Sequence, residues 1–533
     1  MRDEQETVGE ALIRLLAEAR TEVCFGIPGV HTLELFRGLR PHGLRHVLSR
    51  SEQGAVFAAD GYARTTGRVG VALLISGPGV TNAATAIAQA YHDSIPLLIV
   101  STVVPDAELA RRWGSLHELP DQRATMASLT AFSEHVDDAE RLPDVLARAY
   151  RLFAFERPRP VHIELPVDLL SRPAPPISFR PPEGERPRPD EAVVEAAAAR
   201  LASAARPKIL IGGGAIDAGP QVGRLAERLG APVAASLNAK GAVPDDHPLS
   251  LGTTLPATAT IKALSEADVL LAVGTEFSPV DSYYSEVELE PRGELIRIDL
   301  DPSQLELPFP ASIAMCGDAS TALERLDQAL GRLGAAPRAD GIAEATAIRE
   351  AVRWWPRAQP LMPLVDAIGA ALPEDSVVAC DSTQLAYIGQ NAWPGRHPRS
   401  WMVPAGLGTL GPALPLAIGG AVGRPGATAF CVVGDGGLLF SIGEMATAAS
   451  LGLPVVMLLW NNDGYQEMRD EMDALGIPHV GTEAGAKDYG AIAAGFGWSS
   501  FRPHSLEEVV ATLGRCASPS GPALIELTPE LLS

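Results

Sequence analysis

Basic residues are in deficit in this chain of 533 residues, which has 43 Lys and Arg against 65 Asp and Glu and a formal net charge of −22. Proteins that bind nucleic acid or anionic membrane surfaces through their charge show the opposite balance. The composition therefore predicts no nucleic-acid partner and no membrane partner. It leaves a cationic small molecule open as a substrate.

Cysteine is also scarce, with five residues and no CxxC pair. This spacing does not fit a zinc site or a disulfide framework. Cys380 and Cys431 lie in apolar runs typical of strands, so we expect free buried thiols in a reducing cytoplasm. No apolar run is long enough to span a bilayer, and the first residues, MRDEQETVGE, are too polar for a signal peptide.

Helix-like segments alternate with short apolar runs along most of the chain. This pattern predicts an α/β protein with three doubly wound parallel-sheet domains. We divide the chain into an N-terminal domain (1–171), a central domain (191–335) and a C-terminal domain (350–533). The stretch 172–190 is rich in proline and polar residues, so we expect an extended linker there.

The most informative stretch contains two apolar runs that each end in polar and glycine residues. The run 429–433 ends in Gly-Asp-Gly-Gly, and the run 454–460 ends in Asn-Asn-Asp-Gly. In a βαβ unit such strand ends meet at one edge of the sheet, where ligands bind. Asp435 and Asn462 should therefore lie side by side. Their hard oxygens suit Mg²⁺ whose other ligands are phosphates and water.

The spacing of GDGG and NN resembles the thiamine diphosphate motif of the acetolactate synthase and 2-oxo acid decarboxylase superfamily. The resemblance implies Mg²⁺ held by Asp435, Asn462 and the carbonyl of Gly464. Glycines at 434, 436 and 437 let backbone N–H groups approach a diphosphate. We therefore expect Gly434, Gly436 and Gly437 to bind the cofactor.

Glu52 is the candidate catalytic residue. On local grounds it is a favourable charge in the first turn of a helix whose N-cap is Ser51. However, SEQGAVFAADGYAR and SGPGVTNAATAIAQAYHDSIPLLIVS resemble the pyrimidine-binding domain of the same superfamily. The resemblance implies that Glu52 hydrogen-bonds N1′ of the aminopyrimidine, which helps the cofactor to lose its C2 proton.

Two further segments carry expected cofactor contacts. Ser382 and Gln384 follow an apolar run, and their polar groups could meet a phosphate. PAGLGTLG resembles the family segment in which the Gly408 carbonyl accepts a hydrogen bond from the 4′-amino group. There Leu410 would be the apolar wedge under the bent cofactor, although a leucine in such a stretch is otherwise core.

The central block resembles the superfamily domain that binds FAD in acetolactate synthases. A glycine run at 212–214 lacks the GxGxxG spacing of a dinucleotide site. The stretch 274–279 reads GTEFSP where the FAD-binding members have an arginine and paired aspartates. We therefore expect FAD to be unlikely here and the central block to be a scaffold.

The residues after Asn462 bear on the reaction. Acetolactate synthases carry a tryptophan near position 471, whereas this chain has Glu467, Asp470 and Glu471. Glu467 and Glu471 share a helix face, as either a solvated acidic face or a site for a guanidinium. NNDGYQEMRDEM, PGVHTLELFRG and HELPDQR resemble 5-guanidino-2-oxopentanoate (2-ketoarginine) decarboxylases. These motifs add Val30 and His117 to the candidate substrate residues, although His117 is equally well read as a loop histidine.

Three functions remain open. The first is a decarboxylase of a basic 2-oxo acid in arginine catabolism, and the second is a carboligase of the acetolactate synthase type or another thiamine diphosphate lyase or transferase. The third, a non-enzymatic member, predicts loss of Glu52 or of the metal motif, and both are intact. The resemblance also implies a homodimer or homotetramer with active sites at the subunit interface.

Overall fold

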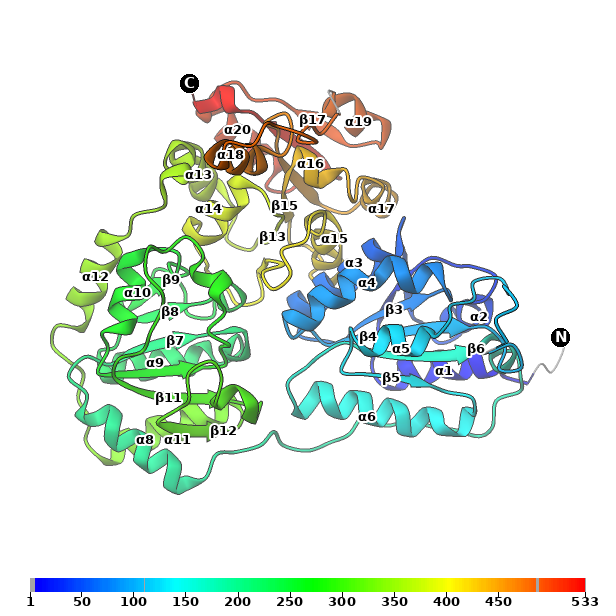
Figure 1. Cartoon of the computed structure of the whole chain (residues 1–533), viewed down its shortest axis with the longest axis horizontal. Coiled ribbons are helices and arrows are strands. Elements are labelled where there is room, and N and C mark those ends of the chain that lie inside the picture. Colours follow the sequence, from blue (N-terminus) through cyan, green and yellow to red (C-terminus); the bar gives the residue numbers. More distant parts are fainter. Residues whose placement is uncertain (1–4, 110, 486–487, 533) are drawn as a thin grey trace.

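A computed structural model describes residues 5–109, 111–485 and 488–532. Its described residues form three six-stranded sheets, in an N-terminal, a central and a C-terminal block. Every strand pair in these sheets is parallel (pairings β1–β2 and β10–β11, for example, run over four and five residues). Figure 1 shows helices on both faces of each sheet, so the expected fold class is confirmed.

The N-terminal sheet has the strand order β2-β1-β3-β4-β6-β5. Its strands β3 and β4 are buried along their whole length, which explains their continuous apolar sequences. The strands are β1 (Val23–Gly26), β2 (Arg45–Leu48), β3 (Gly70–Leu74), β4 (Leu97–Val103), β5 (Phe132–His135) and β6 (Val161–Pro166). The helices are α1 (Val8–Glu18), α2 (Leu33–Leu39), α3 (Glu52–Thr66), α4 (Pro78–His92), α5 (Gln122–Ala127), α6 (Leu142–Phe155) and α7 (Val167–Leu170).

The C-terminal sheet repeats this plan, with the order β14-β13-β15-β16-β18-β17. The first and third blocks therefore share one plan. The strands are β13 (Val377–Cys380), β14 (Trp401–Met402), β15 (Ala429–Gly434), β16 (Val455–Trp460), β17 (Ser499–Phe501) and β18 (Ala523–Leu527). The helices are α13 (Met362–Ala371), α14 (Gln384–Ala392), α15 (Ala413–Gly423), α16 (Asp435–Leu438), α17 (Glu444–Leu451), α18 (Gln466–Leu475), α19 (Tyr489–Gly495) and α20 (Leu506–Cys516).

The central sheet has the order β12-β11-β10-β7-β8-β9, the arrangement of a doubly wound dinucleotide-type fold. An irregular segment crosses from α7 to α8 along the lower edge of Figure 1. The strands are β7 (Lys208–Ile211), β8 (Val233–Ala235), β9 (Ser250–Gly252), β10 (Val269–Val273), β11 (Glu294–Asp299) and β12 (Ile313–Cys316). The helices are α8 (Glu191–Ser203), α9 (Gly219–Leu229), α10 (Thr258–Ser265), α11 (Ala319–Arg332) and α12 (Gly341–Ala351).

Helices α3 and α15 join the first and third blocks at the centre of the molecule (Figure 1). They approach closely because a Cβ on Gly61 would lie only 2.2 Å from the carbonyl oxygen of Leu416. The buried Arg64 adds the central block to this contact. Its Nη1 donates to Asn238 Oδ1 at 3.1 Å and to the Val403 carbonyl at 3.3 Å. One arginine therefore contacts all three blocks.

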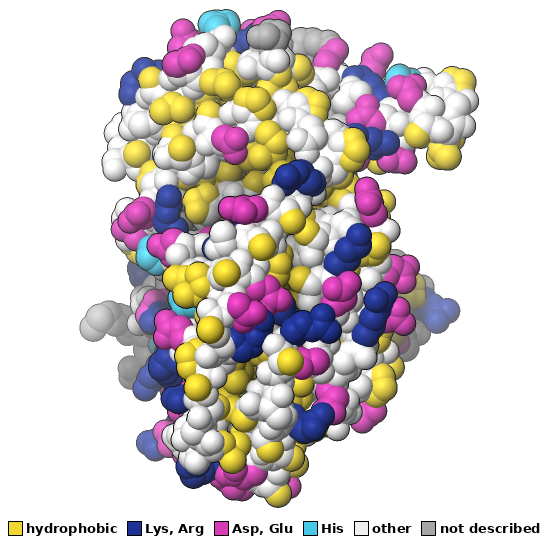
Figure 2. Space-filling view, turned by 90° about the vertical axis from the view of Figure 1, so that its left-hand side faces the viewer, with side chains coloured by type: hydrophobic (Ala, Val, Ile, Leu, Met, Phe, Trp, Pro, Cys, Tyr) yellow, Lys and Arg dark blue, Asp and Glu magenta, His cyan; other side chains and the backbone are white. Residues whose placement is uncertain are grey.

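Charged side chains of both signs are interspersed on the face that Figure 2 shows, which includes the central block. Among the described residues, no helix is both long and apolar enough to cross a membrane. The five cysteines are free, and Cys380 and Cys431 are buried as expected.

Candidate functional site

The strand register brings the two polar strand ends together. Gly434 at the end of β15 pairs with Trp460 at the end of β16, so the residues that follow are neighbours. The amide oxygen of Asn462 lies 3.3 Å from Asp435 Oδ1 and 3.0 Å from the Gly464 carbonyl oxygen. The three residues expected to bind Mg²⁺ therefore converge on one point.

The oxygen atoms of this set face one another, an arrangement that suits a bound hard cation and leaves the oxygens unsatisfied without one. With the amide turned over, its nitrogen would donate to both neighbours and its oxygen would accept from Trp460 Nε1 at 3.1 Å. In the orientation found, oxygens face one another without a proton between them. Neighbouring ligands on an octahedral Mg²⁺ lie about 3.0 Å apart, because the bonds are roughly 2.1 Å long. The spacing therefore suits Mg²⁺.

The electrostatics of Asp435 point the same way. Its Oδ2 is buried and makes no hydrogen bond within the described part of the chain. Burial raises the pKa of this carboxyl, while backbone N–H groups of Gly436 and Gly464 partly oppose the rise. A bound cation would restore the charged form. A single carboxylate with amide and carbonyl oxygens leaves most of the coordination shell to phosphate and water.

Asp381, at the end of β13, organises the loop that contains Gly408. Its carboxylate accepts from the backbone N–H groups of Ser382 at 2.9 Å, Gly411 at 3.1 Å and Ala413 at 3.2 Å. Ser382 Oγ in turn donates to the Gly408 carbonyl at 3.2 Å. Two predicted cofactor residues therefore meet, and the half-buried Leu410 lies in the same loop. Sequence reasoning did not select Asp381, because its role depends on a loop 30 residues away.

Gln384 connects the oxygen set to the acidic helix α18. Its Oε1 accepts from Asn462 Nδ2 at 3.3 Å, and its Nε2 donates to Glu467 Oε2 at 3.1 Å and Asp470 Oδ2 at 3.0 Å. The expected shared face of α18 is confirmed, since Arg357 contacts Glu467 at 3.3 Å and Glu471 at 2.6 Å. A guanidinium does bind this acidic pair, but it is supplied by the chain itself.

A cavity of about 570 Å³ lies beside these residues. Gly408, Ser382, Glu467 and Glu471 line it from the C-terminal block. The central block and the segment before α13 close it with aromatic, acidic and basic side chains, which include Asp281, Tyr283, Tyr284, Trp355 and Arg357. Two predicted cofactor residues and two predicted substrate residues of this block therefore share one cavity, whereas Gln384, Leu410 and the turn that contains Asp435 do not line it.

Glu52 stands at the first turn of α3, and Ser51 is its N-cap as expected, with its Oγ accepting from Gly54 N at 3.0 Å. The Glu52 carboxylate is half-buried and accepts from Asn82 Nδ2 at 3.0 Å. Within the described residues, no other hydrogen bond reaches this carboxylate. In the described part of the chain, no hydrogen bond or ion pair joins it directly to Asp435, Asn462 or Gly464.

Glu444 of α17 holds the start of α3 in place. Its Oε1 accepts from the backbone N–H groups of Arg50 at 2.8 Å and Ser51 at 3.1 Å. A Cβ at position 54 would lie 2.2 Å from that oxygen, so the glycine of the SEQGA motif makes room for it. The helix that carries Glu52 is thereby fixed to the C-terminal block. The SEQGA motif by itself does not indicate that Glu444 is the partner of this helix start.

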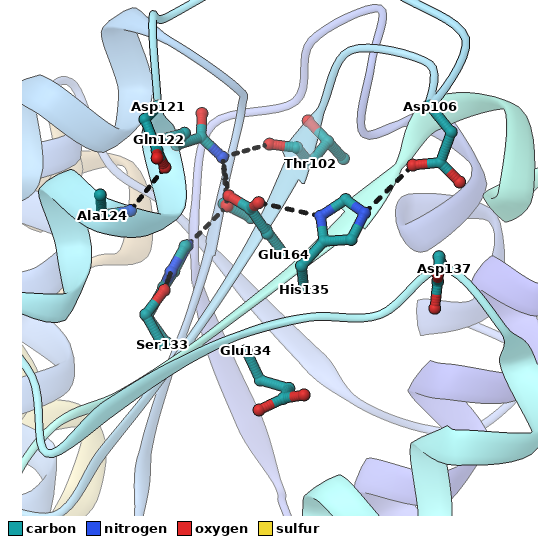
Figure 3. Close-up of polar contacts among 12 residues, drawn as sticks. Thr102, Asp106, Asp121, Gln122, Ala124, Ser133, Glu134, His135, Asp137 and Glu164 are labelled. Carbon is teal, nitrogen blue, oxygen red and sulfur yellow. Dashed lines mark hydrogen bonds and ion pairs between the residues drawn. The ribbon is translucent and has the colours of Figure 1, made fainter. Parts of the chain in front are cut away.

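A buried polar network supports the SGPG turn beside Glu52. Gln122 Oε1 accepts from Gly77 N at 2.9 Å, and Gln122 Nε2 donates to Glu164 Oε2 at 2.9 Å. Glu164 Oε1 pairs with His135 Nδ1 at 2.9 Å, and His135 Nε2 with Asp106 at 3.0 Å (Figure 3). The SGPG turn packs directly against Glu52, since a Cβ at Gly79 would lie 3.6 Å from Glu52 Cγ. The network therefore supports the surroundings of Glu52.

This network predicts a pH dependence of stability. The hydrogen bond to Glu164 is the largest cause that raises the pKa of His135 above its ordinary value, with Asp106 adding to it. A group with a raised folded-state pKa stabilises the protein below its unfolded pKa, and this stabilisation is lost as pH rises through the folded value. From pH 6 to 8.5, scanning fluorimetry should show a larger fall in Tm for the wild type than for His135→Gln. Parallel curves would contradict the prediction.

His117 and Val30 lie in the N-terminal block, away from the 570 Å³ cavity. His117 Nδ1 is buried and, within the described residues, makes no hydrogen bond. Its ring centroid lies 5.0 Å from that of His31, whose Nδ1 is 2.6 Å from Ser76 Oγ in the SGPG turn. Val30 is 66% exposed. Both residues lie near the Glu52 half of the site rather than the Asp435 half.

A second cavity, of about 310 Å³, lies where the three blocks meet, and most of its lining comes from the N-terminal and central blocks. It includes the glycine run 212–214 and the loop after β10. Glu276 of that loop forms an ion pair with Arg157 of the N-terminal block. Glu276, in the stretch compared above with the FAD-binding members, therefore takes part in a contact between blocks.

Sequence profiles of one family match all three blocks. Residues 6–125 match the N-terminal TPP binding domain of thiamine pyrophosphate enzymes, residues 194–326 their central domain, and residues 381–527 their C-terminal TPP binding domain.

Similar proteins span nearly the whole chain. A Pseudomonas aeruginosa protein named "Probable 2-ketoarginine decarboxylase AruI" is 45% identical over 98% of this chain and 94% of its own length. The acetolactate synthase isozyme 1 large subunit of Escherichia coli is 33% identical over 98% of this chain and 93% of its own length. An acetolactate synthase of Mycobacterium leprae is 31% identical over 96% and 85%, respectively.

Proposed function

The chain belongs to the thiamine pyrophosphate enzymes, and from this premise we propose that it decarboxylates 5-guanidino-2-oxopentanoate to 4-guanidinobutanal and CO₂, with thiamine diphosphate and Mg²⁺. The name of the Pseudomonas relative supports this reaction. A place in arginine catabolism is part of the same proposal. The enzyme acts without oxidation, so the carbon that loses CO₂ must gain one proton.

The charge of the 570 Å³ cavity is the observation that carries the choice of substrate. Asp281, Asp381, Glu467 and Glu471 line it, and Arg357 is the single Lys or Arg among its lining residues. Such a cavity disfavours an anionic group at the far end of the substrate and favours a cationic one. A guanidinium on a three-carbon chain supplies such a cationic group, whereas the methyl group of pyruvate carries no charge that could interact with the acidic lining.

In this proposal the chain's own residues bind and orient the reactants. Asp435, Asn462 and the Gly464 carbonyl hold Mg²⁺, and the backbone at Gly434, Gly436 and Gly437, with Ser382 and Gln384, receives the diphosphate. Thiamine diphosphate, when bound, supplies the nucleophile and the electron sink. Glu52 holds a proton at N1′ of its aminopyrimidine, the Gly408 carbonyl accepts from its 4′-amino group, and Leu410 supports its bend.

We further propose a homodimer or homotetramer in which Glu52 serves the partner's Asp435 site. Two observations support this arrangement: Glu52 is half-buried with one hydrogen bond, and Leu407 and Phe440 are exposed apolar side chains at 43% and 55%. A facing subunit would cover such residues. His117 and Val30 would then approach the substrate from the same subunit as Glu52.

We also propose that the enzyme works in the cytoplasm without FAD. The Arg157–Glu276 ion pair supports the absence of FAD, because it bridges two blocks at the cavity that the glycine run 212–214 lines. The purified protein should be colourless, with no absorbance band near 450 nm. A flavin spectrum would contradict this expectation and strengthen the carboligase alternative.

The test of the proposed function is a comparison of kcat/KM for 5-guanidino-2-oxopentanoate, 2-oxohexanoate and pyruvate, with thiamine diphosphate and Mg²⁺ present. We expect the guanidino acid to be preferred over 2-oxohexanoate by roughly 10- to 100-fold, as for a charge-assisted hydrogen bond. A preference for pyruvate would contradict the proposal.

A further inference from the structure

We propose that Asp281 is the carboxylate that binds the cationic end of the substrate, against an aromatic wall formed by Tyr284 and Trp355. The inference rests on the proposed function and names the specificity-determining residue within its site. It moves the recognition of the guanidinium from the acidic helix α18 to the central block.

The other cavity carboxylates already have partners. Glu467 and Glu471 share a counter-charge, because Nη1 of Arg357 contacts one carboxylate oxygen of each. Asp381 accepts from three backbone N–H groups and orients the Gly408 loop. A substrate guanidinium that bound there would share these carboxylates with the groups that already contact them. The remaining carboxylate of the cavity lining is Asp281.

Asp281 lies in η4 (Pro279–Ser282), the short 3-10 turn after β10, and lines both the 570 Å³ and the 310 Å³ cavity. Its Oδ1 accepts from the backbone N–H of Leu237 at 3.1 Å. Among the described residues, no Lys, Arg or His forms an ion pair with it. Burial raises the pKa of Asp281 to about 6, and the nearby Asp93 adds to the rise. A carboxylate that is partly desolvated and left without a counter-charge is suited to receive a cation.

The neighbouring wall suits a planar cation. Tyr284 and Trp355 stack with ring centroids 3.8 Å apart and planes 7° apart, and Tyr387 lies 6.3 Å from Tyr284. Guanidinium groups stack on aromatic faces and bind carboxylates through two parallel hydrogen bonds. The same cavity contains Gly408 and Ser382 of the cofactor half. One cavity thus holds both the groups for the reacting end and those for the cationic end.

The experiment uses the holoenzyme with thiamine diphosphate and Mg²⁺ and compares Asp281→Asn with the wild type. Ser282→Ala is the matched control, because Ser282 is on the same turn but does not line the cavity. We expect Asp281→Asn to raise KM for 5-guanidino-2-oxopentanoate by roughly 10- to 100-fold and to leave KM for 2-oxohexanoate within about threefold. Isothermal titration with unreactive 5-guanidinopentanoate should show the same loss of affinity, while Ser282→Ala behaves as the wild type.

An equal change for both substrates, or no change, would overturn the inference. A selective loss in Glu471→Gln but not in Asp281→Asn would also overturn it and return recognition to α18. If the wild type does not turn over the guanidino acid at all, the proposed function itself fails, so the two failures are distinguishable.

A second variant covers the case in which Asp281→Asn does not fold. Asp281→Glu keeps the charge and extends it by one methylene toward the substrate. It should shift the preference toward 4-guanidino-2-oxobutanoate, which is one methylene shorter. An unchanged preference in a folded Asp281→Glu enzyme would contradict the role of Asp281.

Discussion

Glu52→Gln is expected to fold and assemble as the wild type and to lose roughly 10²- to 10⁴-fold in kcat, the usual contribution of a positioned acid or base. Glutamine keeps the shape of the side chain and can still accept from Asn82, which contacts the carboxylate at 3.0 Å. It cannot share a proton with N1′ of the cofactor. Steady-state CO₂ release, with circular dichroism and Tm as folding controls, measures the effect.

A matched control separates catalysis from the charge at a helix N-terminus. Glu191 also stands in the first turn of a helix, α8, at the surface of the central block. Glu191→Gln should keep wild-type kcat. Near-normal turnover in Glu52→Gln would rule out the N1′ role, and a similar loss in both variants would indicate a general effect of helix-terminal charge.

Asp435→Ala is expected to weaken Mg²⁺-dependent binding of thiamine diphosphate by on the order of 100-fold or more, because it removes the one carboxylate of the oxygen set. In the cofactor-free variant, loss of the unpaired Oδ2 should stabilise the fold and loss of the hydrogen bonds from the Gly436 and Gly464 N–H groups should destabilise it, so circular dichroism of the cofactor-free protein is the folding control. The measurement is the rise in Tm on adding Mg²⁺ and thiamine diphosphate, which reports binding to the folded state.

The control for this prediction is Asp473→Asn, an exposed carboxylate of α18 that pairs with His479. It should show the full rise in Tm of the wild type. If Asp435→Ala also retains the full rise, the metal assignment is wrong.

Local sequence patterns were enough to predict the features of the fold and site that depend only on neighbouring residues and on strand direction. The approach of Asp435 to Asn462 follows from β15 and β16 being adjacent parallel strands, whose ends meet by geometry. The shared face of Glu467 and Glu471 follows from the helical repeat. The short helix α16 was not predicted, because the glycine run that contains it resembles a turn in sequence.

Contacts between distant segments could not be predicted in this way. Arg357 reaches α18 from more than 100 residues away, and it changes the acidic face from an open binding site into a paired one. Gln122 and Glu444 support the Glu52 region from other elements, and nothing in the sequence around either residue indicates this contact, although Gln122 lies within HELPDQR. The role proposed for Asp281 depends on the contact between the central and C-terminal blocks, which the sequence around Asp281 does not indicate. The roles of Val30 and His117 toward the substrate stay predictions.

The most direct test of the central claim is the product balance with 5-guanidino-2-oxopentanoate as the sole substrate, in the presence of thiamine diphosphate and Mg²⁺. The reaction R–CO–COO⁻ + H⁺ → R–CHO + CO₂ requires one 4-guanidinobutanal for each CO₂, with both measured in the same reaction. A ratio of one aldehyde per CO₂ is the result that the account predicts. CO₂ accompanied by a condensed hydroxy-oxo acid instead of the aldehyde would contradict it and identify a carboligase.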